Sequence, residues 1–226
     1  MDQPPFETKK DYILRRVKQK ILDGEYGPGD RLKVRQLATE FGTSEIPVRE
    51  AINQLASMGL VILTPHVGAI ATPVSSRDLQ EIFDIRTALE GLAIRLATPR
   101  ITPEALTEIG QIATDLERAV ESTRDADELG RLNRAFHMAI YRYSHNERLL
   151  GMIEDLWNHA GRYPSPLSGK DDSTYQSLRD HQAILDALRD QDVERAAAIT
   201  EEHKNRSMLR IIAQVKKSEA STLQEH

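Results

Sequence analysis

The sequence predicts a mainly α-helical protein in two parts, a small N-terminal unit with a β-hairpin and a C-terminal antiparallel bundle of six helices. Two observations predict this division. Up to about residue 72, short helical patterns are followed by two apolar, β-branched runs with a turn between them. From residue 75 onward, apolar residues recur at helical spacing in one segment after another. We therefore predict two domains, residues 1–74 and residues 75–226.

Residues 37–59 carry the pattern of two helices joined by a tight turn. The first helix ends at Gly42, and Thr43 or Ser44 can cap the second by accepting a hydrogen bond from a free backbone N–H. The second helix ends near Gly59. Two helices joined by such a turn form a helix-turn-helix. The apolar positions that fit the buried faces are Leu37, Ala38, Phe41, Val48, Ala51, Ile52 and Leu55.

Two strands are predicted directly behind this pair of helices. The segments LVIL (60–63) and AIATPV (69–74) are rich in β-formers and flank a turn over residues 64–68. A hairpin after a helix-turn-helix is the wing of a winged helix-turn-helix. This arrangement typically places the second helix in the major groove of DNA.

The same residues resemble the DNA-binding domain of GntR-type bacterial regulators. The segment LATEFGTSEIPVREAINQLASMGLVILTPHVGAIA has the PVREA and GLV elements at the family's separation from the wing glycine. Upstream, ILDGEYGPGDRL resembles the exit from the family's first helix. The resemblance covers residues 10 to 72 and implies that the protein binds a double-stranded DNA operator.

In a helix-turn-helix, the beginning of the second helix meets base edges while flanking groups hold phosphates. Arg49 can contact a guanine with two hydrogen bonds or hold a phosphate, and Arg35 is placed to hold the backbone. By resemblance, the wing enters the minor groove with His66 at its tip, where Gly68 allows a tight turn. The DNA-contact candidates are Arg35, Thr43, Ser44, Glu45, Ile46, Pro47, Arg49, His66 and Gly68.

Plainer interpretations of these residues stay open. Arg49 can be a solvated side chain that pairs with Glu45 one helical turn earlier, and His66 can be an ordinary turn residue. Glu45 itself departs from the family, which commonly has Arg there. A carboxylate repels phosphate and accepts hydrogen bonds only from cytosine or adenine amino groups. The family's usual half-site is therefore not carried over to this chain.

Composition narrows the class of protein. The formal net charge is -5, but residues 1–72 carry 10 basic and 9 acidic residues, so the acidity belongs to the second part. The absence of cysteine excludes disulfides, thiolate metal sites and cysteine nucleophiles. No apolar run reaches the length of a membrane span, and the N-terminus does not resemble a signal peptide. We expect a cytoplasmic protein without a membrane partner.

The sequence from residue 75 onward predicts a series of helices. Residues 75–78 carry a capping start for the first of them, and residues 102–104 open the second. Residues 163–173 are predicted to form a loop because of their Pro, Gly and Ser content. Consecutive helices without strands indicate an antiparallel bundle. The predicted helices span about residues 79–98, 102–121, 125–143, 146–162, 175–189 and 192–217.

Three histidines lie on different predicted helices of this bundle. His137 follows Asn133 by four residues, so the two share one helical face, whereas His181 and His203 lie on the last two helices. Three imidazoles with one oxygen ligand suit Zn²⁺ or Ni²⁺ and leave a position for water or a ligand. From spacing alone, each histidine is more readily explained as an ordinary core or surface residue than as a metal ligand.

This half resembles the FCD ligand-binding domain of FadR-type members of the GntR family. The segments NRAFH, DHQAIL and EEHKN match its signature in order, and RTALE matches a segment of its first helix. Six helices fit the VanR-like subgroup better than the seven-helix FadR form. The resemblance implies a divalent metal ion held by Asn133, His137, His181 and His203. Asn133 replaces the frequent Asp, which should lower the affinity for the metal and leave the site more positive.

A cation beside Arg86 is suited to a small carboxylate effector, because the acid can complete the coordination and pair with the guanidinium. Each of the further candidates named below can instead be a surface residue or a residue that supports the direct contacts without touching the effector. Tyr141 and Trp157 are expected in the core. The further effector candidates are Arg134, His159, Arg162 and Tyr163.

Together these features predict a transcription regulator, expected to be a repressor, that binds a pseudo-palindromic operator as a homodimer and responds to the acid. One alternative keeps the DNA-binding unit but has a purely structural metal and no effector. Another is a metal-dependent hydrolase, since three histidines can activate water. The chain has no HExxH motif and no Gly-rich phosphate loop. We therefore expect that it is not an enzyme.

Overall fold

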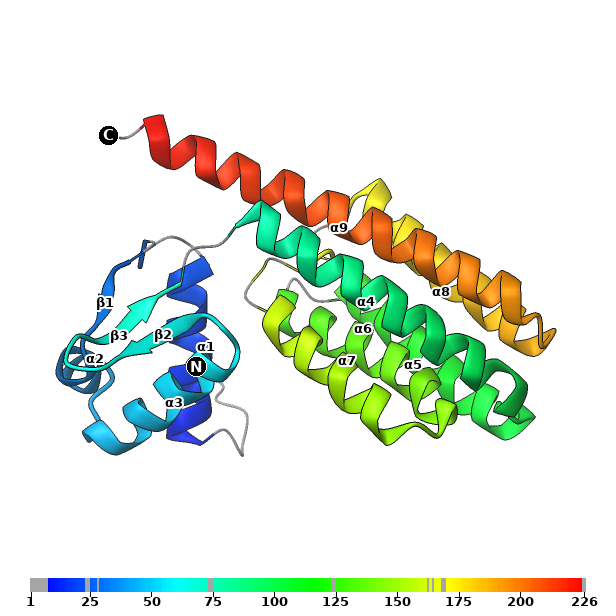
Figure 1. Ribbon diagram of the computed structural model, residues 1–226, viewed down its shortest axis with the longest axis horizontal. Coiled ribbons are helices and arrows are strands. Elements are labelled where there is room, and N and C mark those ends of the chain that lie inside the picture. The colour runs from blue at the N-terminus through cyan, green and yellow to red at the C-terminus, as the bar shows by residue number, and fades with distance from the viewer. Residues whose placement is uncertain are drawn as a thin grey trace. The chain divides into compact units, whose positions relative to one another are not determined.

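The computed structural model describes residues 8–22, 25–27, 29–72, 75–122, 125–161, 163, 165–167 and 170–224, with side chains for all of these except Leu22 and residues 217–224 (Figure 1). The chain divides into two units. The first joins Met1–Ser75 to Trp157–Tyr163, and the second joins Ser76–Leu156 to Pro164–His226.

The first unit is a winged helix-turn-helix, as predicted. Three helices surround one buried apolar cluster, to which Val17, Leu37 and Leu55 contribute. The small sheet has the strand order β1-β3-β2, and both pairings are antiparallel. Its elements are α1 (Lys9–Leu22), β1 (Arg31–Leu32), α2 (Val34–Glu40), α3 (Glu45–Ser57), β2 (Val61–Thr64) and β3 (Gly68–Ala71).

Two glycines end the helices of the DNA-binding motif. Gly42 has a φ of 59°, and the amide after it donates to the Ala38 carbonyl at 2.9 Å. Gly59 has a φ of 69°, and the amide of Leu60 donates to the Leu55 carbonyl at 2.9 Å. This six-to-one hydrogen bond with a left-handed residue is the Schellman cap, and glycine adopts that backbone without steric cost. Both helix ends are therefore encoded locally.

The wing contains a strand that the sequence did not reveal. Arg31 and Leu32 form β1 and pair with Ile70 and Ala69 of β3. A two-residue strand has no periodicity to detect, so the wing is three-stranded where a two-stranded hairpin was expected. Ser44 occupies the predicted N-cap position of α3, but its side chain makes no capping hydrogen bond.

Within the described residues, six α-helices follow the wing, in agreement with the prediction, and all belong to the second unit except the last residues of α7, from Trp157 onward, which belong to the first. α8 begins earlier than predicted because Asp171 caps it, accepting from the Thr174 amide at 2.9 Å. Two short 3₁₀ turns, Thr98–Arg100 and Arg142–Ser144, follow α4 and α6. The helices are α4 (Ser76–Ala97), α5 (Pro103–Ser122), α6 (Ala126–Tyr141), α7 (Glu147–Ala160), α8 (Asp172–Arg189) and α9 (Val193–Gln224).

The long helix α9 packs along α4 and α8, and α6 packs against α4 and α5 (Figure 1). Most of the buried surface is apolar. However, polar and charged side chains are also buried on the four helices α4, α6, α8 and α9, which is unusual without partners or a ligand. Those with charged, amide or imidazole side chains are Arg86, Glu90, Asn133, His137, Asp180, His181, His203 and Lys204, and the buried Tyr141 adds a hydroxyl group.

Candidate DNA interface and metal centre

The exposed beginning of α3 carries a three-residue charge cluster. Glu45 lies between two arginines: its Oε2 is 2.8 Å from Arg49 Nη2, and its Oε1 is 3.3 Å from Arg35 Nε. The hydrogen bond from Arg49 is the main reason that the pKa of Glu45 lies below its usual range. The pair that the sequence allowed between Glu45 and Arg49 therefore forms in the DNA-free protein. Whether Arg49 also contacts a base stays a prediction.

The other candidates at this helix start differ in exposure. Ile46 is 68% exposed, and Ser44 is also exposed. Thr43 and Pro47 are half-buried. The structure thus presents Ile46, with the two arginines, on the surface that a helix-turn-helix turns toward DNA.

The wing tip is a tight turn closed by a hydrogen bond from the Val67 amide to the Thr64 carbonyl at 3.2 Å. His66 has a φ of 63° and Gly68 a φ of 97°, so both lie in the left-handed region. His66 and Gly68 are exposed. The structure therefore confirms that the chain turns sharply here, and it leaves the imidazole at the surface.

In the second unit, the three predicted histidines come together. One ligand nitrogen from each of His137, His181 and His203 lies within 4.8 Å of the others. The ring centroids are 4.8 to 5.2 Å apart, and all three side chains are buried. Asn133 is buried one turn before His137 on α6. Three helices thus bring together residues that are up to 70 positions apart in the chain.

The chemistry of this cluster fits a divalent metal ion. Burial lowers the pKa of all three histidines, so each ring is neutral near pH 7 and retains a lone pair for coordination. Neither ring nitrogen of His181 has a hydrogen-bond partner, and Asn133 Oδ1 also lacks one. A buried polar atom without a hydrogen-bond partner lowers the stability of the fold by about 1–3 kcal/mol. A bound ligand that contacts these atoms would remove that penalty. A metal ion is such a ligand.

A buried ion-pair network lies beside the histidines. Glu90 on α4 receives Arg86 Nε at 2.8 Å, Lys204 Nζ at 2.7 Å and the Tyr141 hydroxyl at 2.7 Å. Burial raises the pKa of Glu90, but Arg86 and Lys204 outweigh it and bring the pKa to about 2. Burial also lowers the pKa of Lys204 to about 8. The two cations thus outnumber the single carboxylate.

A second carboxylate, Asp180, contacts His203 from the surface side. Its Oδ2 lies 3.1 Å from His203 Nδ1, and its Oδ1 lies 2.8 Å from Arg206 Nη2. Burial raises the pKa of Asp180, but the hydrogen bonds with His203, Arg206 and Gln176 bring it to about 2. Asp180, His203 and Arg206 line a surface cavity of about 360 Å³ between α8 and α9.

Sequence reasoning did not place Lys204, Asp180 or Tyr141 beside the histidine cluster. Lys204 and Asp180 are direct chain neighbours of His203 and His181. A charged residue next to a histidine that is predicted to be buried could have indicated a buried charge near the cluster. Tyr141 was expected in the core, and it is completely buried, but its hydroxyl pairs with Glu90.

The effector candidates are distributed over both units. Arg86 is buried against Glu90, with its guanidinium 4.8 Å from the centre of the Phe83 ring. Arg134 is half-buried, and burial lowers its pKa. His159 and Tyr163 belong to the first unit, where His159 is exposed and the Tyr163 hydroxyl donates to the Ser75 carbonyl at 2.9 Å. Arg162 lies outside the described residues.

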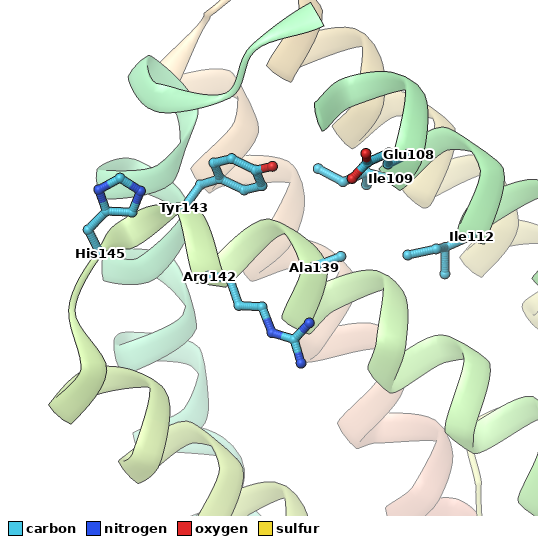
Figure 2. Close-up of a pocket in the computed structure, with 7 residues that line it drawn as sticks. All are labelled: Glu108, Ile109, Ile112, Ala139, Arg142, Tyr143 and His145. Carbon is cyan, nitrogen blue, oxygen red and sulfur yellow. The ribbon is translucent and has the colours of Figure 1, made fainter. Parts of the chain in front are cut away.

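A separate pocket of about 290 Å³ lies between α5 and the end of α6 (Figure 2). Figure 2 shows the Tyr143 ring pointing toward Glu108, with Ile109, Ile112 and Ala139 along the pocket. Its charged side chains are exposed, and it includes none of the histidines of the cluster. We assign no role to it.

Comparison with known proteins agrees with both halves of the structure. Residues 9–70 match the bacterial regulatory proteins of the gntR family, and residues 81–206 match the FCD domain. The described helices include none that is long and apolar enough to cross a bilayer.

Individual relatives extend over most of the chain. The uncharacterized HTH-type transcriptional regulator YdhC of Bacillus subtilis (strain 168) is 30% identical over 200 residues, covering 87% of this chain and 89% of YdhC. The HTH-type transcriptional repressor GlaR of Escherichia coli (strain K12) is 28% identical over 196 residues, covering 84% and 89%. The solved structure of E. coli McbR/YncC matches with a TM-score of 0.68 at 28% identity, covering 94% and 99%. These relatives are transcriptional regulators, in agreement with the expectation that the chain is not an enzyme.

Proposed function

Because the chain belongs to the gntR family of bacterial regulatory proteins and carries an FCD domain, we propose that it is a cytoplasmic repressor whose operator affinity is set by a small organic acid bound at a metal ion in the helical unit. The observation that carries this proposal is the convergence of His137, His181 and His203 in the core of that unit. Repression is supported by relatives that are named repressors, among them GlaR and the gluconate operon repressor of Bacillus licheniformis.

On DNA, the start of α3 contacts bases and phosphates while the wing reaches the minor groove. Arg35 and Arg49 supply positive charge, and Ile46 is exposed enough to contact a thymine methyl group. Thr43, Ser44 and the wing residues His66 and Gly68 approach the backbone and groove. Protein binding releases counterions from the DNA phosphates, so the affinity for DNA falls as the salt concentration rises. Glu45 and Pro47 complete the proposed contact set.

A pseudo-palindromic operator requires two copies of the DNA-binding unit. Ile85 and Leu92 support a dimer interface on α4, because they lie two helical turns apart on one face and are 51% and 44% exposed. Ala88 is exposed between them. Ile82 and Phe83, by contrast, face the core of their own chain. We place the second copy against the Ile85–Leu92 face.

Asn133, His137, His181 and His203 would hold the metal ion, with Zn²⁺ or Ni²⁺ as the best-suited ions. When bound, the ion supplies a positive centre with a coordination position for an exogenous ligand. All four protein ligands are neutral, so its charge is not compensated, and Arg86 with Lys204 adds more positive charge than Glu90 removes. This balance favours an anionic effector such as a small carboxylate. Arg134, His159, Arg162 and Tyr163 stay candidates for its further contacts.

The first experiment is elemental analysis of native protein purified without chelators or metal-affinity resin, next to a His137→Ala/His181→Ala double variant. We expect about one divalent ion per chain in the wild type and none in the variant. The metal-loaded protein is then screened with small carboxylates for a change in its affinity for an operator selected from random DNA. Coupling of this kind typically amounts to about 1–3 kcal/mol.

Two results would contradict the proposal at different points. Metal-free wild-type protein after careful handling removes the coordination site. Metal-loaded protein whose DNA affinity no acid changes supports the alternative of a DNA-binding protein with a purely structural ion.

A further inference from the structure

We infer that Asp180 and the Glu90–Tyr141 pair are positioning residues that hold His203 and His137 as the Nδ1–H tautomers, so that both rings present the lone pair of Nε2 to the metal centre. This inference rests on the proposed metal site and concerns residues outside its four ligands.

The first contact joins His203 to Asp180, with 3.1 Å between Nδ1 and Oδ2. Asp180 also receives Arg206 through Nη2 at 2.8 Å and through Nε at 3.3 Å, and the Gln176 amide at 2.9 Å. A carboxylate that faces a guanidinium in this way is ionised and can only accept hydrogen bonds. The ring nitrogen that faces it must therefore donate. His203 carries its proton on Nδ1, and its Nε2 lone pair is left for the metal.

The second contact reaches His137 through a tyrosine. The Tyr141 hydroxyl donates its one proton to Glu90 Oε2 at 2.7 Å, because Glu90 is paired with Arg86 and Lys204 and is itself only an acceptor. The Tyr141 oxygen is then left as the acceptor for His137 Nδ1, 3.5 Å away and one helical turn earlier. This longer contact favours a proton on Nδ1 of His137 as well.

The third histidine is positioned differently. The rings of His181 and Phe136 lie 4.5 Å apart between centroids, and neither nitrogen of His181 has a hydrogen-bond partner. Packing orients this ring, while its tautomer is left open. Two of the three rings are therefore set for coordination before a metal arrives, and binding at these rings requires no proton to move between their nitrogens.

The direct test is ¹⁵N NMR of the histidine side chains in metal-free wild-type protein near pH 7.5, with assignments from single His→Gln variants. Two-bond couplings distinguish the two neutral tautomers. We expect Nδ1–H for both His137 and His203. Predominance of Nε2–H at either ring would overturn the inference, and this measurement depends neither on metal uptake nor on the folding of a core variant.

A second test measures Zn²⁺ affinity by competition with a chromophoric chelator. Tyr141→Phe removes the acceptor of His137 together with one donor to Glu90, and Asp180→Asn removes the negative charge that faces His203 and Arg206. We expect each to weaken Zn²⁺ binding about 10- to 100-fold, and Tyr141→Phe to lower the Nδ1–H population of His137 as well. The matched controls, Tyr143→Phe and Asp172→Asn, lie outside these two contacts and keep wild-type affinity.

The two proposals fail in different ways. Wild-type affinity in both Tyr141→Phe and Asp180→Asn would overturn the positioning role while leaving the metal site in place. A wild-type protein that takes up no Zn²⁺ would contradict the proposed metal site, and the tautomers of the metal-free protein would still decide the inference.

Discussion

Lys204 and Glu90 form an ion pair of 2.7 Å in which both side chains are at least 97% buried. The pair connects α9 to α4, the helices that carry the third histidine and the proposed dimer face. A buried ion pair adds little net stability compared with apolar side chains, but removal of one partner leaves a charge without full compensation. The stability of the bundle therefore depends on this ion pair remaining intact.

We predict that Lys204→Met lowers the free energy of unfolding of the metal-free protein by about 3 kcal/mol, because Glu90 then keeps only Arg86 and Tyr141 as partners. Urea denaturation in the presence of a chelator measures this. Lys216→Met, at an exposed position of the same helix, should change little. The Lys204→Met/Glu90→Gln double variant should lose less than the sum of its single variants. A strictly additive result would show that the two side chains do not interact.

The stability of the metal-free protein should depend on pH in two separate windows. Burial lowers the pKa of the three clustered histidines, so below pH about 6.5 the unfolded chain binds protons that the folded chain does not. The free energy of unfolding then falls as the pH falls, by at most about 1.4 kcal/mol per pH unit for each histidine. His137→Gln should make this slope shallower. An unchanged slope would contradict a lowered pKa of His137 in the folded protein.

The second window lies at lower pH. Glu90 and Asp180 have folded-state pKa values of about 2, below the ordinary values of 4.5 and 3.8. Their stabilising contribution is complete above the ordinary values and is lost as the pH falls toward 2. Acid unfolding monitored by circular dichroism should therefore continue to steepen below pH about 4.5. Glu90→Gln should remove part of this acid-dependent loss.

Glu45→Gln should strengthen binding to random-sequence duplex DNA roughly three- to tenfold at low salt, since it removes a negative charge and releases Arg35 and Arg49 from their pairs. Fluorescence anisotropy over a salt series measures this effect. Glu50→Gln is the control, because Glu50 is exposed on the same helix and has no part in the cluster. If both variants gain the same affinity for DNA, the change in net charge explains the effect and the pairing of Glu45 with the two arginines does not.

Ile85→Glu should convert the proposed dimer into a monomer of 25.5 kDa, since a carboxylate in an apolar interface costs roughly 2 kcal/mol or more. Sedimentation velocity at several concentrations measures the mass. Met152→Glu introduces the same charge at a residue that is 55% exposed on α7, and it should leave the dimer intact. Retention of the wild-type mass by Ile85→Glu would place the interface elsewhere.

Much of the local structure follows from residues that are close in the chain. Gly42 and Gly59 end their helices because the left-handed backbone there suits a residue without Cβ. The four-residue spacing of Asn133 and His137 places both on one face of α6 for the same local reason. The six helices of the bundle were likewise visible as apolar stripes. The gathering of the three histidines was predicted only through family resemblance.

The remaining features depend on tertiary structure. Two residues become the strand β1 only because β3 offers a free edge, and Lys204 meets Glu90 only because α9 packs along α4. Asp180 on α8 reaches His203 on α9 through a contact that no local period encodes, whereas Tyr141 lies one helical turn from His137 on α6. The sequence by itself determined the helices and the glycines that end α2 and α3. Packing decided which charges are buried together, because long-range neighbours depend on how helices assemble and not on spacing along one of them.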